Sequence, residues 1–145
     1  MSGMKLSKKA EYALRALVVL AGRPSSQSIQ IQELATIGSI PVKFLEQILL
    51  VLKRSSLLVS KRGVGGGYQL NRPANQIFLA EVIEIMDGPL LQSCCEPPDS
   101  SAPGFRGLHQ SMQELNSLII TTLRSQSIAD ILAREEPDSV LALNI

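Results

Sequence analysis

Apolar residues recur every three or four positions along most of this sequence, a spacing that places them on one face of an α-helix. Ser7 is a suitable N-cap for the first such stretch, and Gly22 and Pro24 end it. Between residues 57 and 70 the pattern changes to two short segments around a glycine cluster, which predicts strands. Residues 23–30 are predicted to form a loop. The expected helices cover residues 8–21, 31–37, 41–54, 79–87, 105–123 and 128–133.

A helix-turn-helix motif is predicted within residues 31–54. The segment Gly38-Ser39-Ile40 is a tight turn in which Gly38 breaks the short first helix, and Pro41 opens the second. The apolar positions of the second helix that are expected to point inward are Leu45, Ile48, Leu49 and Leu52. The positions expected on the other side are Lys43, Glu46, Gln47, Leu50, Lys53 and Arg54.

A β-hairpin is predicted directly after this motif. Residues 57–62 form the first strand, residues 63–67 a glycine-rich turn, and residues 68–70 the returning strand. A hairpin that follows a helix-turn-helix motif is a wing. The expected fold class is therefore mainly α with a small β-hairpin wing.

The long helix predicted from Phe105 to Leu123 carries an apolar seam with alternating spacings of four and three residues, a pattern typical of packing between partner helices. The seam residues are Leu108, Met112, Leu115 and Ile119. We expect a winged helix-turn-helix domain over residues 1–88, a sensor loop over 89–104, and a dimerisation helix with a C-terminal tail over 105–145.

Composition narrows the class of protein. A chain of 145 residues has the size of one domain and can build a core without disulfide bonds. The two cysteines are adjacent, and the longest apolar runs are far shorter than the ~20 residues of a membrane span. We therefore expect a cytoplasmic protein with no membrane association.

Charge is distributed very unevenly along the chain. Residues 1–75 contain eleven lysines and arginines but three acidic residues, a net charge of +8. Residues 76–145 contain three arginines and ten acidic residues, a net charge of −7. The basic half predicts an anionic partner, and a winged helix-turn-helix domain identifies that partner as double-stranded DNA.

Candidate DNA contacts follow from side-chain chemistry. Gln47 can pair with adenine, Glu46 can accept from cytosine, and Lys43 can bond guanine or phosphate. In the wing, glycines let the backbone approach DNA closely, and an arginine can enter the minor groove. The glycines match neither a dinucleotide-binding nor a Walker A motif. The expected wing contacts are Lys61, Arg62, Gly63 and Gly65.

Two other classes of function fit the sequence less well. An enzyme is disfavoured because the chain has one histidine and lacks metalloprotease, nucleophile-elbow and Cys-x-x-Cys motifs. A protein-interaction adaptor is compatible with a winged helix, but the basic wing favours DNA.

The sequence resembles the Rrf-two family of winged-helix transcriptional regulators over nearly its whole length. The resemblance rests on Glu11 to Leu17, on Ile40 to Leu49 with its Leu-Glu-Gln, and above all on Arg62-Gly-Val-Gly-Gly-Gly-Tyr-Gln-Leu70. It implies a homodimeric transcription factor, expected to be a repressor. The dimer forms through the long helix and binds a partly palindromic operator.

The resemblance also implies a sensor loop, because many family members bind an iron–sulfur cluster through three spaced cysteines. Here the loop carries only Cys94 and Cys95. With His109, and with Glu11 at the family's acidic position, these residues are the candidate ligands of a [2Fe–2S] cluster. The alternatives are a thiol redox switch, control by a partner protein or small molecule, and constitutive binding.

Overall fold

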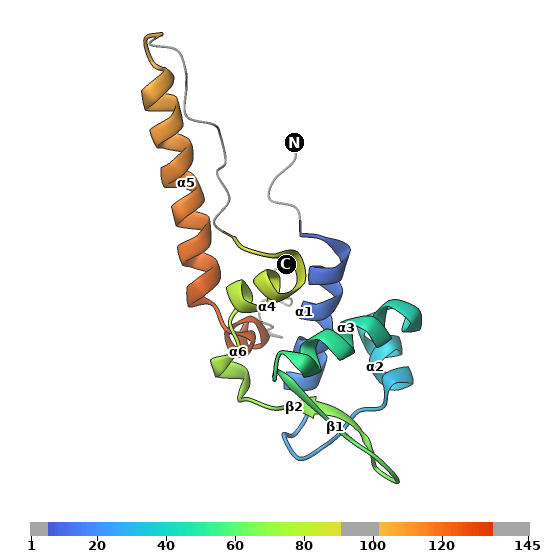
Figure 1. Ribbon diagram of the computed structural model, residues 1–145. Coiled ribbons are helices and arrows are strands. Elements are labelled where there is room, and N and C mark those ends of the chain that lie inside the picture. Colours follow the sequence, from blue (N-terminus) through green and yellow to red (C-terminus); the bar gives the residue numbers. More distant parts are fainter. Residues whose placement is uncertain (1–5, 91–101, 135–145) are drawn as a thin grey trace, which may run out of the picture.

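The computed structural model describes residues 6–90 and 102–134 and has the arrangement shown in Figure 1. Within these residues the chain forms a mainly helical fold with one two-stranded antiparallel sheet, as the sequence predicted. The elements in chain order are α1 (Lys8–Ala21), α2 (Ile31–Gly38), α3 (Val42–Arg54), β1 (Leu58–Lys61), β2 (Gly67–Leu70), the 3-10 helix η1 (Ala74–Gln76), α4 (Leu79–Asp87), α5 (Phe105–Ser125) and α6 (Ile128–Ala133).

Helix α1 is the centre of the core. It contacts α2, α3, α4 and α6, and the predicted cap is present, since Ser7 Oγ accepts a hydrogen bond from the Ala10 amide at 3.0 Å. Its buried positions are Ala10, Ala13, Ala16, Leu17 and Leu20. Leu14, Val18 and Ala21, which continue the apolar pattern of this helix, are partly buried against the same core. Several helices surround α1, and its alanines let them approach closely.

Helix α2 ends one residue later than predicted, so the turn before α3 begins at Ser39. Gly38 belongs to α2, and Ser39 takes the left-handed conformation that ends the helix, with φ 53° and ψ 49°. A Cβ at Gly38 would lie 3.0 Å from the end of the Ile40 side chain, so a larger residue there would require Ile40 to shift slightly. Pro41 precedes α3 as its N-cap. The predicted inward residues of α3 are confirmed as buried: Leu45, Ile48, Leu49 and Leu52.

The hairpin is anchored to the helices by a contact that the sequence analysis missed. Ile29, in the predicted loop, is buried and exchanges two backbone hydrogen bonds with Tyr68, of 2.9 and 2.8 Å. Gly67 makes this bridge possible: its φ is 139°, and a Cβ would overlap the carbonyl group of Ile29. The segment after α1 therefore pairs with β2 instead of forming a free loop.

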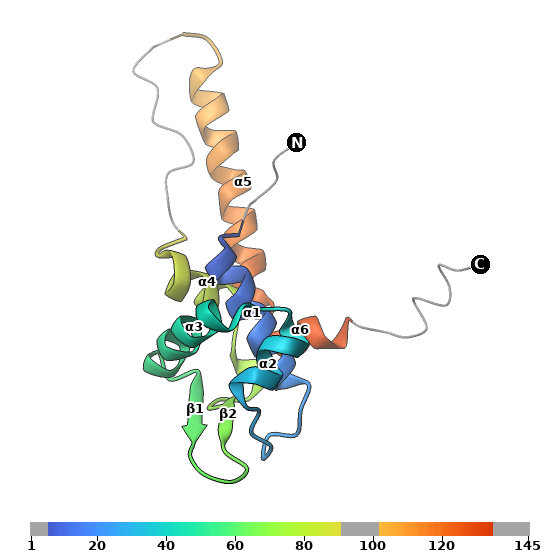
Figure 2. The same ribbon diagram turned by 90° about the vertical axis from the view of Figure 1, so that its right-hand side faces the viewer.

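Helix α5 projects away from the other helices. Figures 1 and 2 both show it beginning far from the other helices and running back to meet α4 and α6. Only Ile120 and Leu123, near its end, are buried. The chain then turns into α6, which starts with a capping box between Ser127 and Asp130.

In the residues that the structure describes, no single helix is long and apolar enough to cross a membrane. Helices α2 and α3 reach that length and composition only together, and they are bent by 110° at the turn between them.

Candidate nucleic-acid interface

Helix α3 presents a polar face to solvent because its apolar face is used entirely in the core. Lys43, Glu46 and Gln47, the predicted base-contacting residues, are all exposed. Leu50, Lys53 and Arg54 are exposed as well. The burial of its opposite face fixes the rotation of α3 about its axis, so this set of side chains has one defined direction.

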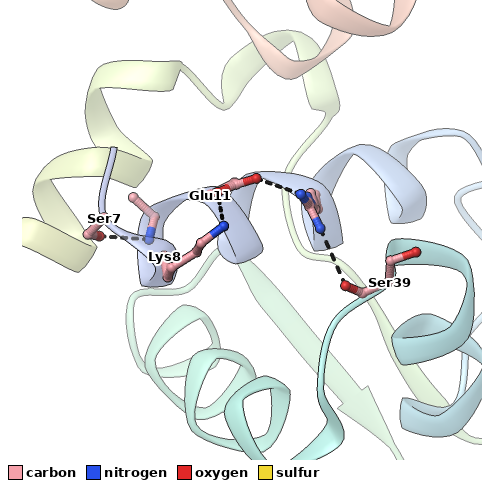
Figure 3. A network of polar contacts seen from close by, with 6 residues as sticks. Ser7, Lys8, Glu11 and Ser39 are labelled. Carbon is pink, nitrogen blue, oxygen red and sulfur yellow. Dashed lines mark hydrogen bonds and ion pairs between the residues drawn. The ribbon is translucent and has the colours of Figure 1, made fainter. Parts of the chain in front are cut away.

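A polar network from α1 holds the turn that precedes α3 (Figure 3). Arg15 donates a hydrogen bond from Nη1 to the Ser39 carbonyl at 3.3 Å. Its Nη2 contacts Glu11 Oε1 at 2.5 Å, and Glu11 Oε2 also accepts from Lys8 Nζ at 3.2 Å. The left-handed residue of the turn is thereby tied to the exposed side of α1.

An aromatic contact joins the same side of α1 to the first turn of α3. The rings of Tyr12 and Phe44 lie 6.2 Å apart between centroids. The cations of Lys8 and Arg15 lie 5.8 and 5.5 Å from the centre of the Tyr12 ring. Sequence reasoning missed these contacts, although the polar residues at positions 8, 11, 12 and 15 recur with helical spacing and so share one face of α1.

The predicted cations of the wing are exposed to solvent. Lys61 and Arg62 are exposed, and Gly63 and Gly65 have φ angles of 93° and 76°. Val64, between these glycines, is fully exposed at the tip. At the base of the wing, Lys53 of α3 donates to Ser60 Oγ at 2.7 Å. This hydrogen bond links the end of α3 to β1, so two basic elements lie next to each other.

The candidate cluster ligands are not assembled in the described residues. Cys94 and Cys95 lie outside them, and no three His, Cys, Asp or Glu side chains there form a possible metal site. The carboxylate of Glu11 is already paired with Lys8 and Arg15. The hydrogen bond from Lys8, with the charges of Lys8 and Arg15, lowers the pKa of Glu11. Among the described residues, the ion pairs of Glu11 orient the guanidinium of Arg15 toward the turn before α3.

The free surface of α5 is rich in exposed apolar side chains. Leu108, Leu115 and Ile119 of the predicted seam are 62%, 53% and 43% exposed, and Phe105 and Leu118 are also exposed. Met112 is partly buried. Five large exposed apolar residues on one helix form a patch of the kind that mediates protein contacts.

The helix-turn-helix motif, the hairpin behind it and the basic tip define a winged-helix protein of the kind that binds DNA. Residues 6–134 match the family model Rrf2, described as an iron-dependent transcriptional regulator. The chain therefore belongs to the Rrf2 family, as the resemblance in its sequence implied.

Individual relatives agree with this assignment. A helix-turn-helix-type transcriptional regulator of Mycobacterium tuberculosis is 34% identical over 97% of this chain and 88% of its own length. The transcriptional regulator IscR of Xenorhabdus nematophila is 31% identical over 92% of this chain and 82% of its own. The structure of CymR, the global cysteine regulator of B. subtilis, has the same fold, with a TM-score of 0.79 and 24% identity over 92% of this chain and all of that one. The chain is thus a transcriptional regulator and not an enzyme.

Proposed function

We propose that the protein is a homodimeric regulator that binds a partly palindromic operator in double-stranded DNA. The observation that carries this proposal is the division of α3 into a buried apolar face and an exposed polar face beside a basic wing. The proposal includes action in the cytoplasm and repression, in which the dimer occupies a promoter and excludes the polymerase.

Helix α3 is the element that reads bases. Lys43, Glu46 and Gln47 lie in its first two turns, the part of a recognition helix that enters the major groove. Lysine bonds guanine, glutamine pairs with adenine, and glutamate accepts from cytosine N4. Together these three side chains can distinguish several base pairs within one half-site.

The wing contacts the minor groove or the phosphate backbone. Arg62 and Lys61 supply positive charge, and Gly63 and Gly65 keep the backbone free of side chains where the wing approaches DNA. A guanidinium in a narrow minor groove responds to the shape of the DNA, which adds sequence preference without base contacts.

The apolar surface of α5 forms the dimer interface. Two copies that bury this surface against each other present two α3 helices to successive major grooves, about 34 Å apart. The sensor loop at 89–104 joins α4 to this interface. A change in the loop can therefore alter the spacing of the two α3 helices and with it the affinity for the operator.

The signal acts on this loop, and two chemistries are candidates. A [2Fe–2S] cluster held by Cys94, Cys95, His109 and Glu11 is supported by the iron-dependent description of the family, and it requires Glu11 to leave its ion pairs. The alternative is a cluster-free regulator controlled by thiol oxidation, a partner protein or a small molecule.

The proposal is tested by selecting binding sites from a randomised duplex pool and measuring affinity at fixed salt. Arg62→Ala should weaken binding to the selected site by ~1–3 kcal/mol. Arg106→Ala, which removes an exposed cation in the first turn of α5, at the end that projects away from α3 and the wing, is the matched control and should leave binding unchanged. An Arg62→Ala protein with unaltered affinity would contradict the role of the wing.

A further inference from the structure

Leu50 is an exposed apolar residue in the middle of the polar face of α3. Its side chain is 48% exposed, although the core positions of the same helix are all 4% exposed or less. Positions 43, 47, 50 and 54 follow the four-and-three spacing that aligns side chains along a helix. Leu50 therefore stands in one line with Lys43, Gln47 and Arg54.

The fold gives no reason for leucine at this position. The four buried leucine and isoleucine residues of α3 already complete its packing, and Leu50 projects away from them. A large apolar side chain on a free surface gains nothing from solvent. Single exposed leucines are common on protein surfaces, but this one lies within the line of polar side chains that the proposed function turns toward a partner, where covering it would remove apolar surface from water.

Charge identifies that partner. The line contains two cations and no acidic residue. Around it, exposed Glu46 on α3 is outnumbered by three exposed cations, Lys53 on α3 and Lys61 and Arg62 on the wing. A partner that matches the cations is polyanionic, yet it must offer Leu50 an apolar group. In the major groove of B-DNA, base pairs present one such group, the C5-methyl of thymine.

We propose that Leu50 selects a thymine in each half-site by packing on its methyl group. This inference rests on the proposed reading of DNA by α3. Seven residues separate Leu50 from Lys43, which is roughly 10 Å along the helix, or about three base-pair steps. With α3 along the groove, the selected thymine lies about that far from the base that Lys43 contacts.

The test removes the methyl group alone. Duplexes selected by the wild-type protein are remade with deoxyuridine in place of thymidine, one position at a time in both half-sites. Burial of one methyl group predicts a loss of roughly fourfold in affinity for each half-site at one position. Leu50→Ala should bind thymine and uracil duplexes equally at that position. Its melting temperature should match the wild type, because the side chain is exposed.

Ile37→Ala is the matched control, since Ile37 is 46% exposed on α2 and outside this line. It should keep the full sensitivity to uracil. The inference is overturned if no position is sensitive, if Leu50→Ala keeps the sensitivity, or if the selected half-sites contain no thymine. It is also overturned if Leu50→Ala changes the association state and not the uracil response.

Failure of the underlying function is distinguishable from failure of this inference. If α3 reads DNA, Lys43→Ala and Gln47→Ala lose affinity for the selected duplex even where uracil has no effect. If neither variant loses affinity, the proposed function of α3 is itself wrong.

Discussion

Arg15 in the middle of α1 donates a hydrogen bond to the main-chain carbonyl of Ser39, the residue whose left-handed conformation ends α2. Because Ser39 is separated from α3 by two residues, this bond connects the central helix of the core to the direction in which α3 points. Glu11 holds the same guanidinium from the opposite side. The network is exposed enough for solvent to weaken it, so its importance lies in geometry more than in stability.

Arg15→Gln should therefore reduce the preference for the selected operator. We expect a loss of about 1 kcal/mol in specific binding, the size of one hydrogen bond from a partly exposed charged group. Affinity for random duplex DNA and its dependence on salt should change little, because Arg15 orients the turn and does not bind phosphate. Equal losses for specific and random DNA, with a shallower salt dependence, would show a phosphate contact instead.

Gly67→Ala should destabilise the protein strongly. A methyl group at this position would overlap the Ile29 carbonyl, and the φ of 139° is costly for alanine. We expect a loss of at least about 2 kcal/mol in the free energy of unfolding, measured by urea denaturation. Gly107→Ala is the control: that residue lies in α5 with open space around it, and alanine there should stabilise by roughly 0.5–1 kcal/mol. An unaffected Gly67→Ala protein would contradict the account of the bridge.

Acid should weaken the capping box of α6. The backbone and side chain of Ser127 hydrogen-bond to Asp130 and lower its pKa. A lowered pKa in the folded state means that the contribution is present above the pKa of the unfolded chain and is lost as the pH falls through the folded value. Wild-type stability should therefore decline more steeply than that of Asp130→Asn below about pH 3.9, the ordinary pKa of aspartate. Parallel urea titrations at several acidic pH values compare the two proteins, and identical pH dependence would argue against this role of Asp130.

Leu115→Glu should prevent dimer formation. The substitution places a charge in the middle of the apolar surface of α5, where burial against a second copy would leave that charge without solvent. Analytical ultracentrifugation should show monomers, and operator binding should fall with the loss of the second half-site. Thr121→Glu, on the polar face of the same helix, should remain dimeric. A dimeric Leu115→Glu protein would place the interface elsewhere.

The nature of the signal can be settled on protein purified without oxygen. Visible absorption bands with stoichiometric iron and sulfide would establish a cluster, and Glu11→Ala, His109→Ala and single cysteine variants should then lose it. A colourless protein that cannot be reconstituted would leave thiol oxidation, a partner protein or a small molecule as the signal.

Local patterns in the sequence were sufficient for most helices and for the two faces of α3. Leu45 and Leu49 could be placed in the core because helical periodicity depends only on near neighbours. The contacts of Ile29 with Tyr68 and of Arg15 with Ser39 join positions that are 39 and 24 residues apart. No periodic pattern reports such pairs. The sequence shows that residue 11 is acidic but does not show that its carboxylate pairs with Lys8 and Arg15, because that depends on side-chain conformation.

The most direct test of the central claim is the binding of Gln47→Ala to the selected operator and to random duplex DNA at one salt concentration. If α3 reads bases, specific affinity should fall by ~1–3 kcal/mol and random binding should remain unchanged, so that the ratio between them collapses. An unchanged ratio would contradict the claim, because it would mean that the exposed face of α3 does not distinguish one base pair from another.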